Sequence, residues 1–270
     1  MNTGLKNKHI VITGASGGIG FDTVSQFLAE GARVTACYNS DPRSLAALSN
    51  EFPEQLNILA VDVQDESSVV SLFTKANDAF GRVDVAVANA GIFSNQGTAL
   101  HEMSIERWQH TLSVNLTGVF LCAKHFFSNL KTHPGNDASL VIVGSTSGDF
   151  GEAGQCDYST SKAGLRGLLL SLKNEIVHLA ARGRVNMVNP GWTATPMAED
   201  ALSDKAKVSK ILQTIPLRKV ATPADIAHTI LYLSSHALAG HVSGQSITVA
   251  GGMEGRVLFA QDELMERIGQ

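Results

Sequence analysis

Short apolar runs alternate with longer helical patterns along almost the whole chain. Seven of these runs are rich in valine and isoleucine and are bounded by Gly, Asp, Asn or Pro, a pattern typical of buried parallel strands. The alternation predicts an α/β protein with a doubly wound, mostly parallel sheet of seven strands and helices on both faces. The expected strands are His9–Thr13, Arg33–Tyr38, Leu56–Val61, Val83–Ala88, Leu140–Val143, Arg184–Val188 and Ser246–Val249.

The segments between the strands carry signals for particular helices. A stripe of leucine and isoleucine from Leu165 to Leu179 predicts an amphipathic helix that Gly183 ends. Asp41-Pro42 predicts the start of another, since an N-cap residue precedes proline at the first helical position. Residues 193 to about 206 are the only long irregular candidate. Because no linker or repeat interrupts the pattern, we expect one domain across residues 1–270.

Composition excludes several function classes. The 21 basic and 25 acidic residues form no basic patch or charged tail, so we expect no nucleic-acid partner. No run reaches the ~18 apolar residues of a membrane span, and the polar start runs straight into a strand, so we expect neither membrane insertion nor a signal peptide. Three scattered cysteines indicate reduced thiols and a cytoplasmic location. The histidines form no metal-binding motif, so no metal site is expected.

A glycine-rich turn joins the first expected strand to the first expected helix. It reads Thr13-Gly-Ala-Ser-Gly-Gly-Ile-Gly20. Its glycines allow a tight turn and let the backbone approach a pyrophosphate, for which the helix N-terminus supplies N–H groups. No lysine follows Gly20, which disfavours a nucleoside triphosphatase loop. The alternative is a flexible turn without a ligand.

Tyr158 and Lys162 are separated by three residues. On a helix this spacing places both side chains on one face, about one turn apart. A nearby positive charge lowers the pKa of a phenol, which suits it to exchange a proton with a substrate oxygen. The pair alone is a common pattern, so its interpretation depends on the motifs around it.

Together these motifs resemble those of the short-chain dehydrogenase/reductase family, in its short single-domain branch. Further elements in the family's order are Asn89-Ala-Gly91, Asn115, Ser145 and Pro190-Gly191, and the resemblance extends from Asn7 to about Gly252. It implies a Rossmann-type fold and hydride transfer between a nicotinamide cofactor and a small-molecule ketone or secondary alcohol. It also implies that residues 5–92 mainly bind the cofactor, 93–252 carry the catalytic and substrate part, and 253–270 form a C-terminal tail.

The resemblance assigns the cofactor site residue by residue. The glycines would hold the pyrophosphate, Asp62 and Val63 the adenine, and the residues after the sixth strand the nicotinamide. The alternative for Asp62 is a helix cap near Asp65-Glu66. The full predicted set is Gly14, Ser16, Gly18, Ile19, Gly20, Tyr38, Asn39, Ser40, Asp62, Val63, Asn89, Ala90, Gly91, Tyr158, Lys162, Pro190, Gly191, Thr193 and Thr195.

The end of the second strand bears on which nicotinamide cofactor is used. Tyr38 stands where an acid would bind the ribose 2′-OH of NAD, and Asn39 and Ser40 follow it. Without that carboxylate a 2′-phosphate is not repelled, and Asn39, Ser40 and Arg43 offer it hydrogen bonds. Asp41 is close but is explained as a helix cap, and no basic residue precedes the middle glycine. We expect NADP(H) to be preferred and NAD(H) to be possible.

The family resemblance also assigns catalytic roles. Ser145 would polarise the substrate carbonyl, Tyr158 would pass the proton, and Lys162 would lower the pKa of Tyr158 and bind the nicotinamide ribose. Asn115 would hold a water that connects Lys162 to solvent. The alternatives are a plain polar turn for Ser145 and a hydrogen-bonded helix residue for Asn115.

Substrate contacts and assembly are less constrained by the sequence. A non-catalytic cofactor-binding sensor of the same fold is the alternative to an enzyme, and an enoyl reductase would carry a longer Tyr-to-Lys spacing. The resemblance implies a homo-oligomer, a tetramer or dimer, packed through apolar faces around Leu112–Leu130 and Ala163–Leu179. The expected substrate-pocket residues are Phe93, Asp149, Phe150, Gln155, Cys156, Trp192 and Met197.

Overall fold

The computed structural model describes residues 2–42 and 45–257, and in these ranges seven parallel strands form one sheet. Their order is β3-β2-β1-β4-β5-β6-β7, which confirms the predicted doubly wound α/β fold. The strands are β1 (His9–Ile12), β2 (Arg33–Tyr38), β3 (Leu56–Ala60), β4 (Val85–Ala88), β5 (Asp137–Val143), β6 (Arg182–Pro190) and β7 (Ser246–Val249).

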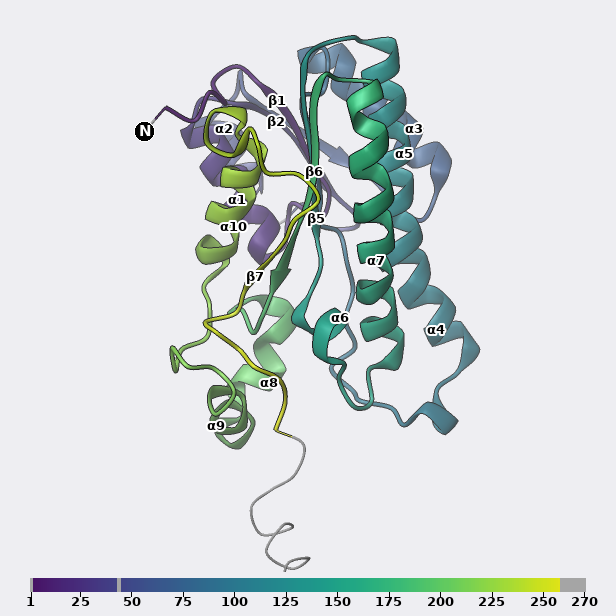
Figure 1. Ribbon diagram of the computed structural model, residues 1–270, viewed down its shortest axis with the longest axis vertical. Coiled ribbons are helices and arrows are strands. Elements are labelled where there is room, and N and C mark those ends of the chain that lie inside the picture. The colour runs from purple at the N-terminus through teal and green to yellow at the C-terminus, as the bar shows by residue number, and fades with distance from the viewer. Residues whose placement is uncertain (1, 43–44, 258–270) are drawn as a thin grey trace, which may run out of the picture.

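Helices cover both faces of the sheet (Figure 1). On one face, α3 (Glu66–Phe80), α5 (Gly118–Thr132) and α7 (Cys156–Glu175) pack into one core cluster. On the other face, α1 (Gly18–Ala29), α2 (Leu45–Glu51) and α10 (Pro223–Ser234) pack into a second. Strand β1 divides its side chains between the two, because successive residues of a strand point to opposite faces. Both faces are therefore apolar, which explains the continuous Val/Ile-rich runs in the sequence.

Local sequence determines where several helices begin. Asp65 is the N-cap of α3, and its side chain accepts a hydrogen bond from the Ser67 backbone N–H at 2.9 Å. Asp62 therefore does not cap this helix, so the alternative interpretation of Asp62 is wrong. Thr222 and Asp225 form a reciprocal capping box at the start of α10.

The structure corrects two predicted boundaries. The helix with the leucine stripe ends at Glu175 and continues as the 3-10 turn η3 (Ile176–His178), so Gly183 does not end it. Gly183 lies in β6, where a Cβ atom would lie 2.9 Å from the Ala180 carbonyl oxygen, because the strand starts tightly against the preceding turn. The segment after β6 is not irregular either.

That segment forms short helices at the end of the sheet. They are η4 (Pro196–Ala198), α8 (Glu199–Ser203) and α9 (Lys205–Leu212). The predicted helix start at Asp41-Pro42 leads into residues 43 and 44, which lie outside the described residues, as does the proposed phosphate contact Arg43. None of the helices in the described ranges is both long and apolar enough to cross a membrane.

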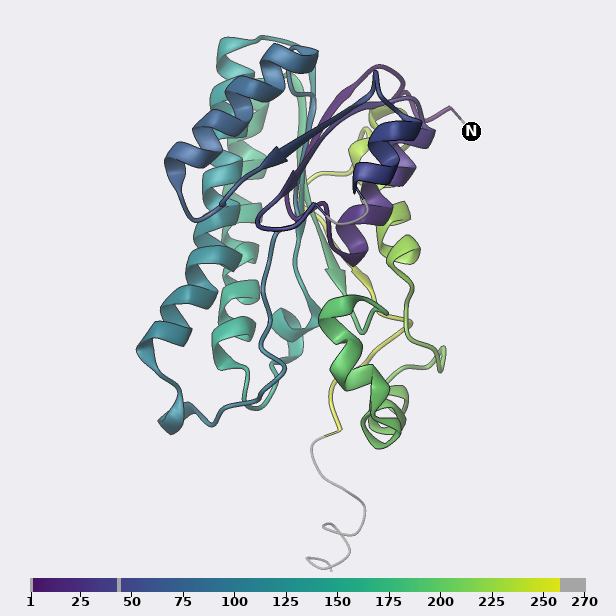
Figure 2. The same ribbon diagram turned by 180° about the vertical axis from the view of Figure 1, so that it is seen from behind.

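The carboxyl ends of the seven strands lie at one edge of the sheet. Helices α6 (Thr146–Phe150), α8 and α9 lie beyond this edge, and the view from behind shows α8 and α9 below it (Figures 1 and 2). Shorter elements complete this end: η1 (Leu100–Glu102), α4 (Ile105–Leu112), the π-helical turn η2 (Ser113–Thr117) and α11 (His236–Ala239), the last lying next to α10. Open parallel sheets bind ligands at this edge.

Candidate active site

A cavity of about 630 Å³ runs along the carboxyl edge of the sheet. This volume lies within the range of small-molecule and cofactor sites. Every residue of the predicted cofactor set lines the cavity, from the glycine turn after β1 to Thr195 before η4. Ser145, Phe93, Trp192 and Met197 line it as well. The tertiary structure thus brings the predicted motifs together in one hollow.

The glycine turn is shaped by close backbone approaches. Gly14 has φ +64°, and a side chain on Gly20 would collide with the Gly14 carbonyl. A Cβ on Gly18 would lie 2.5 Å from Thr195 Cγ2, so this turn and the segment after β6 meet across the cavity. Helix α1 begins here, and no side chain of the described residues caps its N-terminus. The uncapped N–H groups and the space that only glycine leaves fit the pyrophosphate of a dinucleotide.

Asn89 joins the ends of the two central strands. Its Nδ2 donates to the carbonyl oxygens of Thr13 and Gly14, both at 3.0 Å. The Thr13 hydroxyl in turn accepts from the backbone N–H groups of Asn89 and Ala90 at 3.1 Å. These bonds hold the glycine turn after β1 against the end of β4. The cofactor end of the cavity is therefore rigidly connected to the sheet.

Asn115 lies fully buried in the π-helical turn η2 and does not line the cavity. Its Oδ1 accepts from the Ile92 N–H at 2.8 Å, and its Nδ2 donates to the Ile92 carbonyl at 3.0 Å and to Ser161 Oγ at 3.2 Å. A Cβ on Gly91 would lie 3.3 Å from this Oδ1 and 3.4 Å from Lys162 Nζ. The Asn115 side chain thus links the segment after β4 to α7 at Ser161, the residue that precedes Lys162. A π-helical turn at such a position is often found at functional sites.

Ser145 and Tyr158 lie on the same wall of the cavity. Ser145 follows β5 and caps α6, with its Oγ accepting from the Ser147 N–H at 3.1 Å. Tyr158 lies in the first turn of α7, and the Phe93 ring meets its ring edge-on at a centroid distance of 5.0 Å. Lys162, one turn further, has its Nζ 5.8 Å from the centre of the Tyr158 ring and donates to the Val143 carbonyl at 2.9 Å.

Burial dominates the protonation of this pair. It raises the pKa of Tyr158, although a hydrogen bond with Ser145 opposes the rise. It lowers the pKa of Lys162 to about 8, because the buried ammonium has lost its water. The prediction that Lys162 lowers the pKa of Tyr158 is therefore not met in this structure. The amine bonds to the Val143 carbonyl, and the desolvation of the phenol outweighs the other influences.

The substrate prediction is partly corrected. Phe93, Trp192 and Met197 line the cavity, but Phe150 and Gln155 do not. Phe150 ends α6 and is 44% exposed. Gln155 is buried, and its amide is used up by bonds to the Ser94 carbonyl and to Arg107. Two further candidates also lie outside the lining, since Asp149 binds Asn189 and Cys156 contacts Met103.

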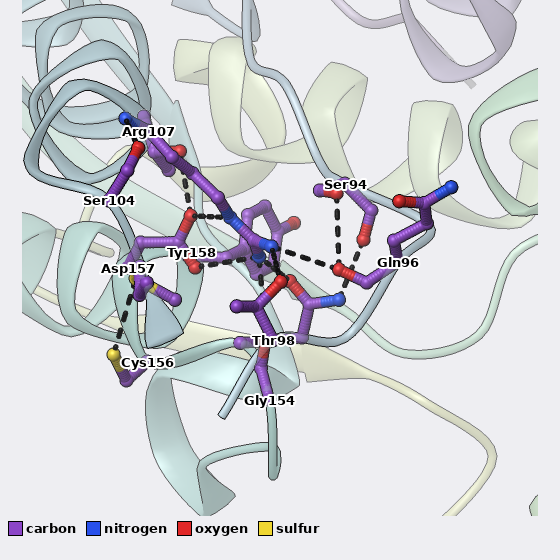
Figure 3. Close-up of polar contacts among 12 residues, drawn as sticks. Ser94, Gln96, Thr98, Ser104, Arg107, Gly154, Cys156, Asp157 and Tyr158 are labelled. Atoms are coloured by element: carbon purple, nitrogen blue, oxygen red, sulfur yellow. Dashed lines mark hydrogen bonds and ion pairs between the residues drawn. The ribbon is translucent and has the colours of Figure 1, made fainter. Parts of the chain in front are cut away.

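Arg107 organises the start of α7 in a way that the sequence did not indicate. Its guanidinium reaches both carboxylate oxygens of Asp157, at 2.9 and 3.3 Å, and the hydroxyl of Thr98 at 2.5 Å (Figure 3). It also donates to the carbonyls of Gln96 and Gly154. Asp157 directly precedes Tyr158 and is buried. Its pKa would rise through burial, but hydrogen bonds from Arg107 and Thr111 hold it below its ordinary value. Arg107 thus anchors the helical turn that carries the phenol.

Arg256 was also missed, because it falls in the segment predicted to be a C-terminal tail. It lines the cavity together with Ser147 and Glu152. No local motif marks these three residues, since the nearest two are five positions apart and Arg256 lies more than a hundred residues further along. Residues 258–270 of the predicted tail lie outside the described residues.

Comparison with known proteins identifies the family. A family model described as enoyl-(acyl carrier protein) reductase matches residues 14–254. A 3-oxoacyl-(acyl-carrier-protein) reductase of Synechocystis sp. is 36% identical, covering 93% of this chain and 98% of that protein. A crystal structure of a short-chain dehydrogenase/reductase from Brucella melitensis matches with a TM-score of 0.84 and 31% identity, covering 94% of this chain and 99% of that one. The chain belongs to the short-chain dehydrogenase/reductase family.

This short-chain dehydrogenase/reductase is thus an NAD(P)-dependent oxidoreductase. A 3alpha-hydroxysteroid dehydrogenase of Mediterraneibacter gnavus is also similar, with 32% identity over 92% of this chain and 97% of that protein. The named substrates of these two relatives differ widely in size and charge. Membership of the family therefore decides the type of reaction and leaves the substrate to be argued from the cavity of this chain.

The lowered pKa of Lys162 predicts a pH-dependent stability. The folded protein gives up this proton at about pH 8, whereas the unfolded chain keeps it up to the ordinary value of 10.5. Between these values the unfolded state binds more protons, so stability rises with pH. We measure the free energy of unfolding of the wild type and of Lys162→Met with urea. Between pH 8 and 10 we expect the value of the wild type to rise relative to that of the variant. A difference that stays constant across this range would contradict the assignment.

Loss of Arg107 should destabilise the turn that carries Tyr158. Arg107→Met leaves the Asp157 carboxylate buried without its ion-pair partner. Breaking a buried pair in this way lowers the free energy of unfolding by about 3 kcal/mol or more. We expect the urea midpoint of Arg107→Met to fall accordingly. The double variant Arg107→Met/Asp157→Asn should recover part of the loss, since no charge is then left unpaired. A wild-type midpoint for Arg107→Met would refute the anchoring role.

Proposed function

We propose that the protein transfers a hydride between NADP(H), or less favourably NAD(H), and a ketone or secondary alcohol, with Tyr158 as the acid/base. The observation that carries this proposal is the shared cavity. One wall holds Ser145 and Tyr158, and the uncapped glycine turn of α1 lines the other end of the same hollow. A bound nicotinamide cofactor would supply or accept the hydride, and the protein would supply position and electrostatics.

The residues of this chain take distinct roles in the proposal. The Ser145 hydroxyl donates a hydrogen bond to the substrate carbonyl and polarises it. The Tyr158 phenol gives its proton to the same oxygen during reduction. Its raised pKa keeps it protonated before the reaction, which favours the acid role and hence carbonyl reduction.

Lys162 and Asn115 have supporting roles: in the proposal Lys162 supplies protons to Tyr158, and Asn115 positions Lys162. The Lys162 amine, with a pKa of about 8, exchanges its proton close to neutral pH. It is therefore suited to reprotonate the Tyr158 phenolate after the reaction. Asn115 fixes the backbone of Ile92 and borders Gly91 beside this amine. In the proposal it positions Lys162 and the route to solvent, and it touches no substrate.

Two other functions are less well supported. Reduction of a carbon–carbon double bond, as the description of the matching family model names, fits a longer Tyr-to-Lys spacing than the one turn between Tyr158 and Lys162. A cofactor sensor without turnover has no need of a polar hydroxyl pair in the cavity wall. Ser145 and Tyr158 are such a pair, and both line the cavity.

The proposed preference for NADP(H) rests on the far end of the cavity. Tyr38, Asn39 and Ser40 line it there, and none of the three carries a negative charge. Asp41 also lines this end of the cavity. It comes three residues after Tyr38, which stands at the end of β2 where an acid would bind the ribose. A 2′-phosphate therefore finds two small hydrogen-bonding side chains at this position.

Assembly and location complete the proposal. Phe120 on α5 and Leu170 on α7 are 45% and 43% exposed on the same side of the sheet. Apolar surface of this kind supports a homo-oligomer built through these helices. The three cysteines are free thiols, which supports a reducing, cytoplasmic location.

Turnover should depend on the phenol of Tyr158. In Tyr158→Phe the ring still packs against Phe93, but the proton donor is gone, so we expect kcat to fall by roughly 100-fold or more. Binding of NADPH, followed by its fluorescence, should persist. Tyr232→Phe, on the surface of α10, is the matched control and should keep its activity. Wild-type turnover in Tyr158→Phe with a panel of ketones would overturn the mechanism.

A carboxylate at position 38 should reverse the cofactor preference. Tyr38→Asp places a negative charge where the 2′-phosphate is expected, so we expect the ratio of kcat/KM for NADPH to that for NADH to fall about tenfold or more. Tyr38→Asn removes the ring without adding charge and should change this ratio much less. A wild-type enzyme that already prefers NADH would show the proposed preference to be wrong.

A further inference from the structure

Arg256 lies where the chain after β7 passes the substrate end of the cavity. It lines both this cavity and a second, more open hollow of about 1080 Å³ between α9 and residues 254–256. Its Nη2 donates to Ser147 Oγ at 3.0 Å. Ser147 is two residues after Ser145, and its own N–H bonds to Ser145 Oγ. The guanidinium therefore stands close to the proposed reaction centre.

The hydrogen-bonding capacity of Arg256 is largely unused. Its ion pair with Glu152 has an N–O distance of 3.5 Å, longer than a normal hydrogen bond. The Glu152 carboxylate is bonded instead to Ser147 Oγ at 2.8 Å. Among the residues that the structure describes, Nη1 reaches only the weakly accepting Met253 sulfur at 3.2 Å, and Nε is buried with no hydrogen-bond partner. A cation that is only 16% exposed rarely leaves so many donors unsatisfied.

The position of Arg256 separates it from the expected phosphate sites. The dinucleotide pyrophosphate fits the N-terminus of α1, and the adenine ribose fits the residues that follow β2. Arg256 instead contacts Ser147 in α6 and Glu152 just after it. The charges of Glu152 and Arg256 act on Tyr158, whose pKa Glu152 raises and Arg256 lowers. An anion at Arg256 would thus belong to the substrate and not to the cofactor.

We propose that Arg256 is the specificity-determining residue of this site and binds a carboxylate of the substrate, which is therefore an oxo acid or hydroxy acid. A planar guanidinium binds a carboxylate through two parallel hydrogen bonds, and the unpartnered Nε with Nη2 forms such a fork. In the free protein Glu152 partly neutralises the arginine. This inference rests on the proposed function, because it assumes a carbonyl held between Ser145 and Tyr158.

The first experiment compares acids with their neutral amides. Acetoacetate and levulinate, each with its carboxamide, are reduced with NADPH by the wild type, Arg256→Gln and Arg256→Lys. We expect wild-type kcat/KM to favour at least one acid by about 10- to 100-fold, mainly through KM, since a hydrogen-bonded charge is lost in the amide. Arg256→Gln should lose this preference. Arg256→Lys should keep only part of it, because an ammonium lacks the fork.

Two further variants sharpen the comparison. Glu152→Gln removes the competing carboxylate, so it should lower KM for the acid and leave KM for the amide nearly unchanged. Arg182→Gln removes an exposed arginine that pairs with Asp137 at the opposite edge of the sheet. It controls for the loss of one positive charge and should leave the acid preference intact.

Binding without turnover separates this inference from the proposed function. Calorimetry of acetoacetate with the NADP⁺-loaded protein forms a complex that cannot react, since both components are oxidised. Binding that is present in the wild type and lost in Arg256→Gln supports the carboxylate site even if no ketone is reduced. A lack of turnover on every ketone would contradict only the proposed function. Reduction of acids and amides at equal rates, with Arg256→Gln unchanged, overturns the carboxylate site and leaves the reductase standing. Absence of both turnover and binding overturns both.

Discussion

The burial of a parallel sheet on both faces is the constraint on which the rest of this structure depends. Apolar side chains from the two helical layers bury β1, β4 and all of β5 except its first residue, which leaves little room for polar groups on either face. The carboxyl edge is where the strands end and their backbone turns away. The glycine turn, Ser145 and Pro190 all line the cavity there because each lies at or just beyond the end of a strand. The position of the site is thus a consequence of how the core is built.

Buried charge shapes the surroundings of Tyr158. Asp157 is held by Arg107, Lys162 bonds to a backbone carbonyl, and Glu152 faces Arg256 through Ser147. Each charged group is taken from water and is stabilised by a specific partner, since an unpaired buried charge would be too costly. Among these groups, and counting contacts with the described residues alone, Arg256 has the least complete set of partners. A substrate carboxylate would complete it, which connects the electrostatics of the cavity to the choice of substrate.

Much of the fold and much of the lining of the candidate site could be predicted because the signals are local. Strand runs, helix caps and the glycine turn act over a few residues. Every residue of the predicted cofactor set lines the cavity, and its role in binding stays a prediction. The failures concern side-chain direction and distant pairs. Phe150 and Gln155 follow Ser145 closely in sequence. Phe150 is nevertheless exposed, and Gln155 is buried with its amide oxygen hydrogen-bonded to Arg107. Gly183 fits a helix end by pattern, but close packing against Ala180 places it in a strand.

The sequence by itself determined the order of strands and helices, the reaction family and the identity of the groups after each strand, because these depend on periodicity and short motifs. Only the tertiary structure decided which charges surround the phenol. Arg107 and Asp157 are 50 residues apart, and Arg256 and Ser147 are 109 apart. Burial is likewise a property of the folded chain, and it raises the pKa of Tyr158 where the spacing to Lys162 alone predicted a fall. Desolvation and long-range pairing depend on the packed fold and leave no local pattern.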